Sequence, residues 1–152
     1  MTVRPLTGAD ATTLAPALAR LPLMQRYGRD AGALGRDLHE ALARGEGLLV
    51  AEDGQGPGGV AWFLPHGTFA LGAYLRLIAV VPGRERRGVG AELLAAFERS
   101  TAAQARHAFL LVSDFNLDAQ RFYARHGYQR VGLLPGLVLP DVDEALFWKR
   151  LR

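Results

Sequence analysis

Apolar and polar positions alternate with a helical period near the beginning of the chain. A short strand is predicted for residues 2–5, and a helix is predicted from Thr7, a capping residue, to about Leu21. A second helix is predicted for residues 31–44, where leucines recur at every fourth position and a glycine follows.

Continuous apolar runs predict strands in the middle of the chain. Residues 47–52 and 60–66 flank the turn-rich segment DGQGPGG and are typical of a hairpin. Residues 73–81 form the longest strand candidate. Its end, residues 77–81, is entirely apolar, which indicates a central strand that is buried on both faces.

The second half of the chain mixes helices and strands. A helix is predicted for residues 88–104, a strand for 107–113, a helix for 117–126, and closing strands for 128–134 and 145–151. The predicted order is β-α-α-β-β-β-α-β-α-β-β. This order predicts an α/β (α+β) fold with a mixed central sheet of about seven strands, flanked by about four helices.

Composition and length predict one globular domain, residues 1–152, without repeats or linkers. Hydrophobic residues make up 49% and charged residues 22%, which is typical of a folded domain. The chain has no cysteine, so disulfides, thiolate metal sites and a cysteine nucleophile are excluded, and we predict no metal. No apolar run predicts a membrane span, and the beginning, MTVRPLTGAD, lacks the pattern of a secretion signal. We therefore expect a cytoplasmic protein.

The positive charge comes almost entirely from arginine. The net charge is +3, and Lys149 is the only lysine among 18 basic residues. A GC-rich genome is one explanation of this bias, and an anionic partner is the alternative. Because the arginines are widely spread without interleaved aromatic residues, we predict no nucleic-acid partner. One cluster stands out, consisting of Arg84, Arg86 and Arg87.

This cluster lies in the segment VVPGRERRGVGAELL, where a predicted strand gives way to a helix. A helix start offers unpaired N–H groups, glycine permits close approach, and Arg86 and Arg87 add positive charge, so the segment fits a phosphate group. The alternative is a turn with a purely structural role. The segment is not a P-loop, and Leu93 stands where a dinucleotide-binding fingerprint has its third glycine.

A second pattern, N-x-x-A-x-x-x-Y-x-x-x-G-Y, follows at Asn116, Ala119, Tyr123, Gly127 and Tyr128. Ala119 and Tyr123 share one helical face, where the small alanine leaves room for a slim ligand. The alternative is that Asn116 is only a helix cap and Tyr123 only a core aromatic residue.

Together the two patterns resemble the GNAT superfamily of acyl-CoA-dependent N-acyltransferases. The strand-to-helix signature of that family is V-x-P-x-x-[RQ]-x-x-G-x-[GA]. Val80, Pro82, Gly88 and Gly90 match it, whereas Glu85 stands at the basic position. The resemblance extends over essentially the whole chain.

The resemblance implies an acetyl-CoA-dependent N-acetyltransferase. It implies direct transfer of the acetyl group to a primary amine of a small molecule or peptide within a ternary complex. Homodimers are frequent in the family, so a homodimer is a further expectation. Two alternatives are a non-catalytic CoA-binding or regulatory module on the same fold and a Rossmann-type nucleotide-binding domain.

The resemblance also implies roles for individual residues. The backbones of Ile78, Ala79 and Val80 would bind the pantetheine arm of acetyl-CoA, as would Asn116. The diphosphate would be held by Arg86, Arg87, Gly88, Val89, Gly90 and Ala91. Tyr123 would donate a proton to the leaving thiolate, since a phenol of pKa near 10 can act as an acid at neutral pH.

The residue that removes the proton of the amine stays open. The strand before the junction reads Tyr-Leu-Arg-Leu and carries no acid, so His66, Asp114 and Glu144 are the candidates. Arg76 in this strand either contacts a carboxylate of the substrate or is a charge at the edge of the strand.

Acceptor binding is expected, by the same resemblance, in residues 20–33 and 134–143. In the first segment, Met24 and Tyr27 are candidates to line an apolar acceptor pocket, although ordinary helix packing explains them equally well.

Overall fold

The computed structural model describes residues 1–152 and contains seven strands and five helices. In chain order they are β1 (Thr2–Pro5), α1 (Gly8–Leu18), α2 (Pro22–Arg26), α3 (Ala31–Ala43), β2 (Gly47–Asp53), β3 (Gly56–Thr68), β4 (Gly72–Val80), α4 (Val89–Thr101), β5 (His107–Ser113), α5 (Leu117–Arg125), β6 (Gln129–Leu134) and β7 (Glu144–Arg150). None of the helices combines the length and apolar character that a membrane span requires.

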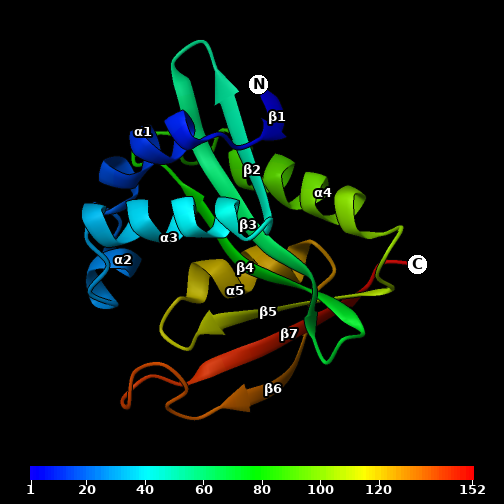
Figure 1. The fold of residues 1–152 in the computed structure, drawn as a ribbon. Coiled ribbons are helices and arrows are strands. Elements are labelled where there is room, and N and C mark those ends of the chain that lie inside the picture. Colours follow the sequence, from blue (N-terminus) through cyan, green and yellow to red (C-terminus); the bar gives the residue numbers. More distant parts are fainter.

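The strands form a single sheet in the order β1-β2-β3-β4-β5-β7-β6 (Figure 1). All neighbouring strands are antiparallel except β4 and β5, which are parallel. The parallel pair is connected by α4, as a crossover between parallel strands requires. The predicted mixed sheet of about seven strands is therefore confirmed.

The structure differs from the sequence prediction at several elements. Helices α1 and α4 end at Leu18 and Thr101, earlier than the predicted Leu21 and residue 104. Two further elements differ more. An additional helix, α2, begins with Pro22 at its first turn and ends at Arg26, so there are five helices rather than about four. A single turn is too short to show a helical period in the sequence. Strand β3 begins at Gly56 instead of residue 60, because Asp53 pairs with Gly56 and the hairpin turn is shorter than the glycine-rich segment.

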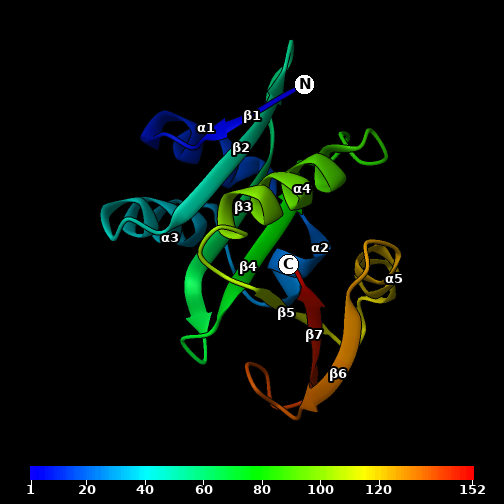
Figure 2. The ribbon, with the colours of Figure 1, turned by 90° about the vertical axis from the view of Figure 1, so that its right-hand side faces the viewer.

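Helices cover both faces of the sheet (Figure 2). Helices α1, α2 and α3 pack on one face over a cluster that includes Leu14, Leu38 and Trp62. Helices α4 and α5 pack on the other face, where Phe97 and Tyr123 belong to a second cluster. Any cleft that passes between two strands of the sheet therefore connects the side of α4 and α5 with the side of the N-terminal helices.

Such an opening lies between β4 and β5. The two strands pair only from Gly72 to Leu75 of β4, opposite His107 to Leu110 of β5. Beyond Leu75 the remaining residues of β4 pair only with β3. The splayed ends of the two parallel strands leave unpaired strand edges in the middle of the sheet, which places a cleft at that point.

Candidate functional site

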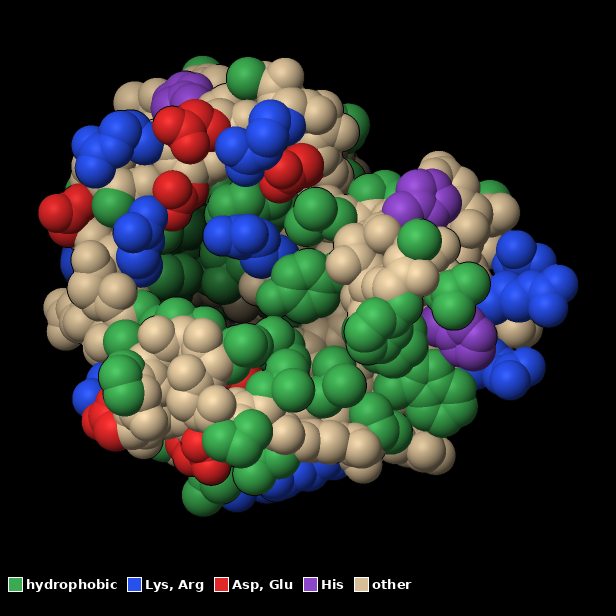
Figure 3. Space-filling view, turned by 60° about the horizontal axis from the view of Figure 1, so that its bottom comes forward, with side chains coloured by type: hydrophobic (Ala, Val, Ile, Leu, Met, Phe, Trp, Pro, Cys, Tyr) green, Lys and Arg blue, Asp and Glu red, His purple; other side chains and the backbone are tan.

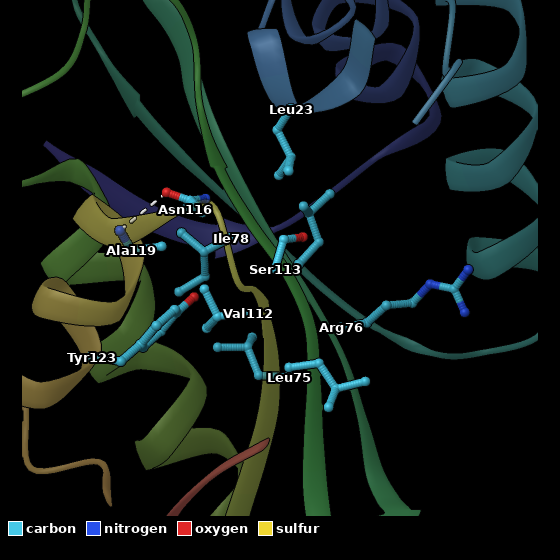
Figure 4. A pocket seen from close by; sticks show the side chains of 11 residues that line it. Leu23, Leu75, Arg76, Ile78, Val112, Ser113, Asn116, Ala119 and Tyr123 are labelled. Carbon is cyan, nitrogen blue, oxygen red and sulfur yellow. Dashed lines mark hydrogen bonds between the residues drawn. The ribbon is translucent and has the colours of Figure 1, made fainter. Parts of the chain in front are cut away.

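A cleft lies between the separated ends of β4 and β5. Its lining comes from α2, β4, β5 and α5 and consists of Leu23, Leu75, Arg76, Leu77, Ile78, Leu111, Val112, Ser113, Asn116, Ala119 and Tyr123. Figure 4 shows Asn116, Ala119 and Tyr123 on one side of the opening and Arg76 on the other, with its guanidinium pointing away from them. The cleft therefore has two distinct sides, one towards α5 and one towards the N-terminal helices.

An irregularity in β4 divides the lining residues between these sides. Leu75 pairs with Phe63 and Leu77 pairs with Trp62, so Arg76 is an additional residue, which is a β-bulge. The bulge reverses the alternation of side chains along the strand. Leu75 and Ile78 both pack on the α4 side, whereas Leu77 packs with the N-terminal helices.

The open edge of β4 offers backbone groups to a ligand. The N–H of Val81 donates to the carbonyl of Gly58 over 2.9 Å. Because backbone groups alternate along a strand, those of Ala79 also point to β3, while those of Ile78 and Val80 point to the opening. Of the three residues that the sequence suggested for the pantetheine arm, Ile78 and Val80 have free backbone groups and Ala79 does not.

The loop between β4 and α4 ends in a row of free N–H groups. The backbone N–H groups of residues 86–91 donate to no acceptor within the protein. Arg86 and Gly88 both have positive φ, 63° and 80°, so the backbone is turned to present these groups together. A Cβ on Gly90 would lie 3.5 Å from Phe122 of α5 and 3.9 Å from Val80, so the start of α4 adjoins the cleft.

The charged side chains of this loop have different roles. Arg84 binds the β2–β3 hairpin, donating to the carbonyls of Gln55 (2.8 Å) and Gly56 (3.1 Å) and pairing with Asp53 (3.2 Å). Glu85 accepts a hydrogen bond of 2.8 Å from the N–H of Gly83 and stabilises the turn.

Arg86 and Arg87, in contrast, are exposed and have no partner. The family signature has a basic residue at the position of Glu85. Here Glu85 stabilises the loop through Gly83 and is not needed to contact a ligand. Arg86 and Arg87 are free to contact an anion next to the row of N–H groups.

Asn116 and Tyr123 are held at the cleft by α5. The side-chain oxygen of Asn116 accepts a hydrogen bond of 3.2 Å from the N–H of Ala119 and caps the helix, while its amide nitrogen has no partner. The hydroxyl of Tyr123 also has no partner, although the residue is only 8% exposed. Burial raises the pKa of Tyr123 above its usual value, which keeps the phenol protonated at neutral pH.

A partly buried hydrogen-bond network lies on the other side of the cleft. The hydroxyl of Tyr27 lies 2.5 Å from the hydroxyl of Ser113 and donates to Oε1 of Glu144 over 2.7 Å. Oε2 of Glu144 is buried and has no partner. Burial raises the pKa of Tyr27, which favours the protonated hydroxyl that bridges the two residues.

The three acid–base candidates from the sequence differ in position. His66 is exposed near the far end of β3, and the exposed Asp114 accepts a 3.2 Å hydrogen bond from the N–H of Asp143. Neither lines the cleft. Glu144 is joined through Tyr27 to Ser113, which does line it. No group of three or more acidic or histidine side chains could hold a metal ion.

The structure also adds residues that the sequence did not single out. Met24 belongs to the core, and its neighbour Leu23 lines the cleft instead. Ser113 lies at the end of β5 and pairs in register with Glu144 of β7. Only the order of the strands brings these two residues together, so no local sequence signal indicates Ser113.

Mixed side chains surround the hollowed face of the molecule (Figure 3). Apolar side chains form the interior of the hollow, and basic and acidic side chains alternate along its upper rim. Such a surface suits a ligand that combines an apolar body with a small number of polar groups.

Comparisons with solved structures show the same fold. Solved structures of the same fold include an aminoglycoside 6'-N-acetyltransferase complexed with coenzyme A (15% identity, TM-score 0.82, covering 100% of this chain and 98% of the other). They also include aminoglycoside 6'-acetyltransferase type Ii (20%, 0.81, 100% and 98%) and a ribosomal-protein-alanine N-acetyltransferase from Brucella melitensis (19%, 0.78, 99% and 99%).

The sequence itself carries the decisive match. No curated protein matches the chain in sequence. The family model of the acetyltransferase (GNAT) domain, however, matches residues 44–130, which is more than half of the chain and includes β4, the loop before α4 and all of α5. The chain therefore belongs to the GNAT family of acetyltransferases.

Proposed function

We propose that the protein transfers the acetyl group of acetyl-CoA directly to a primary amine of a small molecule or peptide, within a ternary complex. The observation that carries this proposal is the row of free N–H groups in residues 86–91, which adjoins the cleft that contains Tyr123. We further propose that residues 1–152 act as one N-acetyltransferase domain.

The groups around the cleft match the successive parts of acetyl-CoA, from its diphosphate to its pantetheine arm. The diphosphate would accept hydrogen bonds from the N–H groups of residues 86–91, with Arg86 and Arg87 adding charge. The pantetheine arm would pair with the free backbone groups of Ile78 and Val80. The unpartnered amide nitrogen of Asn116 would donate to a carbonyl of the same arm.

Tyr123 is our candidate for the general acid. Acetyl-CoA supplies the acetyl group as a thioester, from which coenzyme A departs as a thiolate that must be protonated. The Tyr123 hydroxyl lies in the lining of the cleft without a competing acceptor. Because its pKa is raised, it carries its proton at every pH at which the reaction would be run.

Glu144 is our candidate for the group that receives the proton of the amine. The amine would give a proton to Ser113, whose own proton moves to Tyr27, whose proton in turn moves to Glu144. Each hydroxyl gains one proton and loses one, so the proton ends on the carboxylate. The unpartnered Oε2 is the observation that favours this role, since a buried polar atom without a partner is rare.

Calorimetry tests the ligand. Titrations with acetyl-CoA, CoA, NAD and ATP should give micromolar dissociation constants for both CoA compounds and none for NAD or ATP. Failure of both CoA compounds to bind would refute the proposal.

Thiol release tests the reaction. A panel of primary amines is mixed with acetyl-CoA and the protein, and free CoA is measured with a thiol reagent. Release that depends on a particular amine supports an acetyltransferase. Binding of CoA without release for any amine would favour the alternative, a non-catalytic CoA-binding or regulatory module.

The test should include acceptor amines of several chemical classes. The neighbours of similar fold are named for aminoglycosides and for alanine of a ribosomal protein, so the fold accommodates both small molecules and proteins. The panel should therefore contain amino sugars, amino acids and peptides with free N-termini.

A further inference from the structure

We propose that the acceptor carries a carboxylate near its reacting amine and that Arg76 binds this carboxylate. The inference rests on the proposed acetyl transfer and specifies the substrate class of the same cleft. It depends on where the β-bulge places Arg76, on the absence of any protein partner for its guanidinium, and on the platform that orients it.

The bulge places Arg76 on the acceptor side. Leu75 and Ile78 pack with α4, next to the residues that we assign to acetyl-CoA. Arg76 is the additional residue of β4 and points away from Tyr123 and Asn116 (Figure 4). Its guanidinium is therefore available to a ligand that enters from the side of the N-terminal helices, and not to the pantetheine arm.

An aromatic platform orients the Arg76 side chain. Its guanidinium carbon lies 4.3 Å from the centre of the Trp62 ring, which is within the range of a cation–π contact. The ring is buried, and its N–H donates to Glu46 over 2.8 Å, so the platform is itself fixed. A stacked guanidinium keeps its N–H groups free at the edge of its plane, where a carboxylate can bind with two hydrogen bonds.

No acidic side chain of the protein neutralises Arg76. Glu46 is close enough to feel the charge of Arg76, but its Oε2 accepts from Arg44 over 2.6 Å and its Oε1 accepts from Trp62. The pKa of Glu46 is lowered mainly by the hydrogen bond from Arg44, and Arg76 contributes only the smallest effect, through its charge. Arg76 forms no ion pair within 4.0 Å.

The surroundings limit what else the acceptor can be. Leu23 and Leu77 also line the cleft, which favours an acceptor with a compact apolar body. An unpaired arginine beside the reacting amine repels a second positive charge, so polycationic acceptors are disfavoured. An amine with a carboxylate a few bonds away, as in an amino acid, satisfies both Arg76 and the proposed proton relay from Ser113.

Matched acceptor pairs test the inference. The probes are the primary amines glycine, β-alanine, leucine and phenylalanine, each compared with its carboxamide, which retains the amine and the body but lacks the charge. Thiol release from acetyl-CoA gives kcat/KM for each member. We expect the carboxylates to be better acceptors than their carboxamides by about tenfold to a hundredfold, as a charge-assisted pair of hydrogen bonds predicts.

The variant Arg76→Gln should remove this preference. It keeps a side chain that can lie over Trp62 but loses the charge, and we expect KM for the carboxylates to rise about tenfold or more, with the carboxamides unaffected. Arg99→Gln is the control, because Arg99 is an exposed arginine of α4 without a partner and away from the cleft. The affinity for CoA should be unchanged in both variants, which separates this test from that of the proposed function.

The inference is overturned if carboxamides are accepted as well as carboxylates, or if Arg76→Gln lowers activity on both equally. If no amine of the panel reacts, binding decides instead: N-acetylglycine and N-acetylleucine are titrated into the CoA-bound protein beside their carboxamides and followed by NMR. Shifts for the carboxylates that are lost in Arg76→Gln support the inference, and absence of any preference refutes it. Failure of CoA itself to bind would instead refute the proposed function.

Discussion

The two sides of the cleft offer a ligand different kinds of groups. The side towards α4 and α5 presents mainly backbone, namely the free N–H groups of residues 86–91 and the open edge at Ile78 and Val80. The side towards the N-terminal helices presents side chains, namely the Ser113 hydroxyl with the network behind it and the Arg76 guanidinium.

The two kinds of site tolerate substitution differently. A backbone site depends on turns and glycines, so Glu85 can replace a basic residue in the loop without removing a single N–H group. A side-chain site changes its ligand whenever one residue changes. We therefore expect changes to the backbone site on the first side to weaken binding of acetyl-CoA, and substitutions on the second side to leave that binding unchanged.

The largest effect is expected for Gly88→Val. Gly88 has a φ of 80° and an added Cβ would meet no protein atom within 4 Å, so the new side chain would occupy the space next to the free N–H groups. We expect the affinity for CoA to fall about a hundredfold or more by calorimetry, because the diphosphate could no longer approach the backbone.

Gly45→Val is the matched control. Gly45 also has a positive φ, 73°, and open space around it, but it follows α3 away from the loop. Both variants should lose a similar stability of about 1–2 kcal/mol from the strained backbone. Equal loss of CoA affinity in the two variants would contradict the assignment of the loop.

The next largest effect is expected for Glu144→Gln. The amide cannot take up a proton, so we expect the turnover of a reactive amine to fall about a hundredfold while the affinity for CoA stays unchanged. Glu98→Gln is the control. Like Glu144, Glu98 accepts a hydrogen bond from a tyrosine hydroxyl, and it also pairs with a lysine, but it lies outside the cleft. Unchanged turnover in Glu144→Gln would remove Glu144 from the mechanism.

Most of the fold, and the family to which the chain belongs, could be predicted from the sequence, because their signals are local. The apolar run at the end of β4, the glycines before α4 and the spacing from Asn116 to Tyr123 each lie within one strand–loop–helix segment. The one-turn helix α2 was missed because it contains too few residues to show a period.

The acceptor side could not be assembled in the same way, because its contacts join distant parts of the chain. Tyr27 lies 86 residues from Ser113 and 117 residues from Glu144. In the sequence Tyr27 is only an aromatic residue near a helix. The sequence prediction that it lines an apolar pocket did not include the hydrogen bonds of its hydroxyl. Similarly, the direction of Arg76 depends on a bulge that becomes visible only when β4 pairs with β3.

A smaller effect is expected for Tyr123→Phe. The loss of the acid should slow turnover about tenfold to a hundredfold only, since the CoA thiolate that departs from the acetyl carbon is a good leaving group even without a proton. Tyr128→Phe is the control, because Tyr128 is a buried neighbour whose hydroxyl donates to Glu98 instead. Because the pKa of Tyr123 is raised, the wild-type rate should not fall through deprotonation of Tyr123 below about pH 10. An equal rate in Tyr123→Phe would show that another group protonates the thiolate.

The smallest effect concerns Asp10, which anchors α1 on the acceptor side. The hydrogen bonds from Arg4 lower the pKa of Asp10 to about 2 from 3.8, and Asp10 also accepts from the N–H of Thr7 over 2.8 Å. A lowered pKa stabilises the fold above the unfolded value of about 4, and this stabilisation is lost as the pH falls from about 4 through 2. Because Arg4 is partly exposed, Asp10→Asn should cost only about 1–2 kcal/mol of unfolding free energy at pH 7 in urea titrations, and progressively less below pH 4.

The affinity of this variant for CoA should not change, since α1 lies on the opposite face of the sheet from α4 and α5. A stability difference that is the same at pH 7 and pH 2 would contradict the ion pair, and a weaker affinity for CoA would contradict the independence of the two sides.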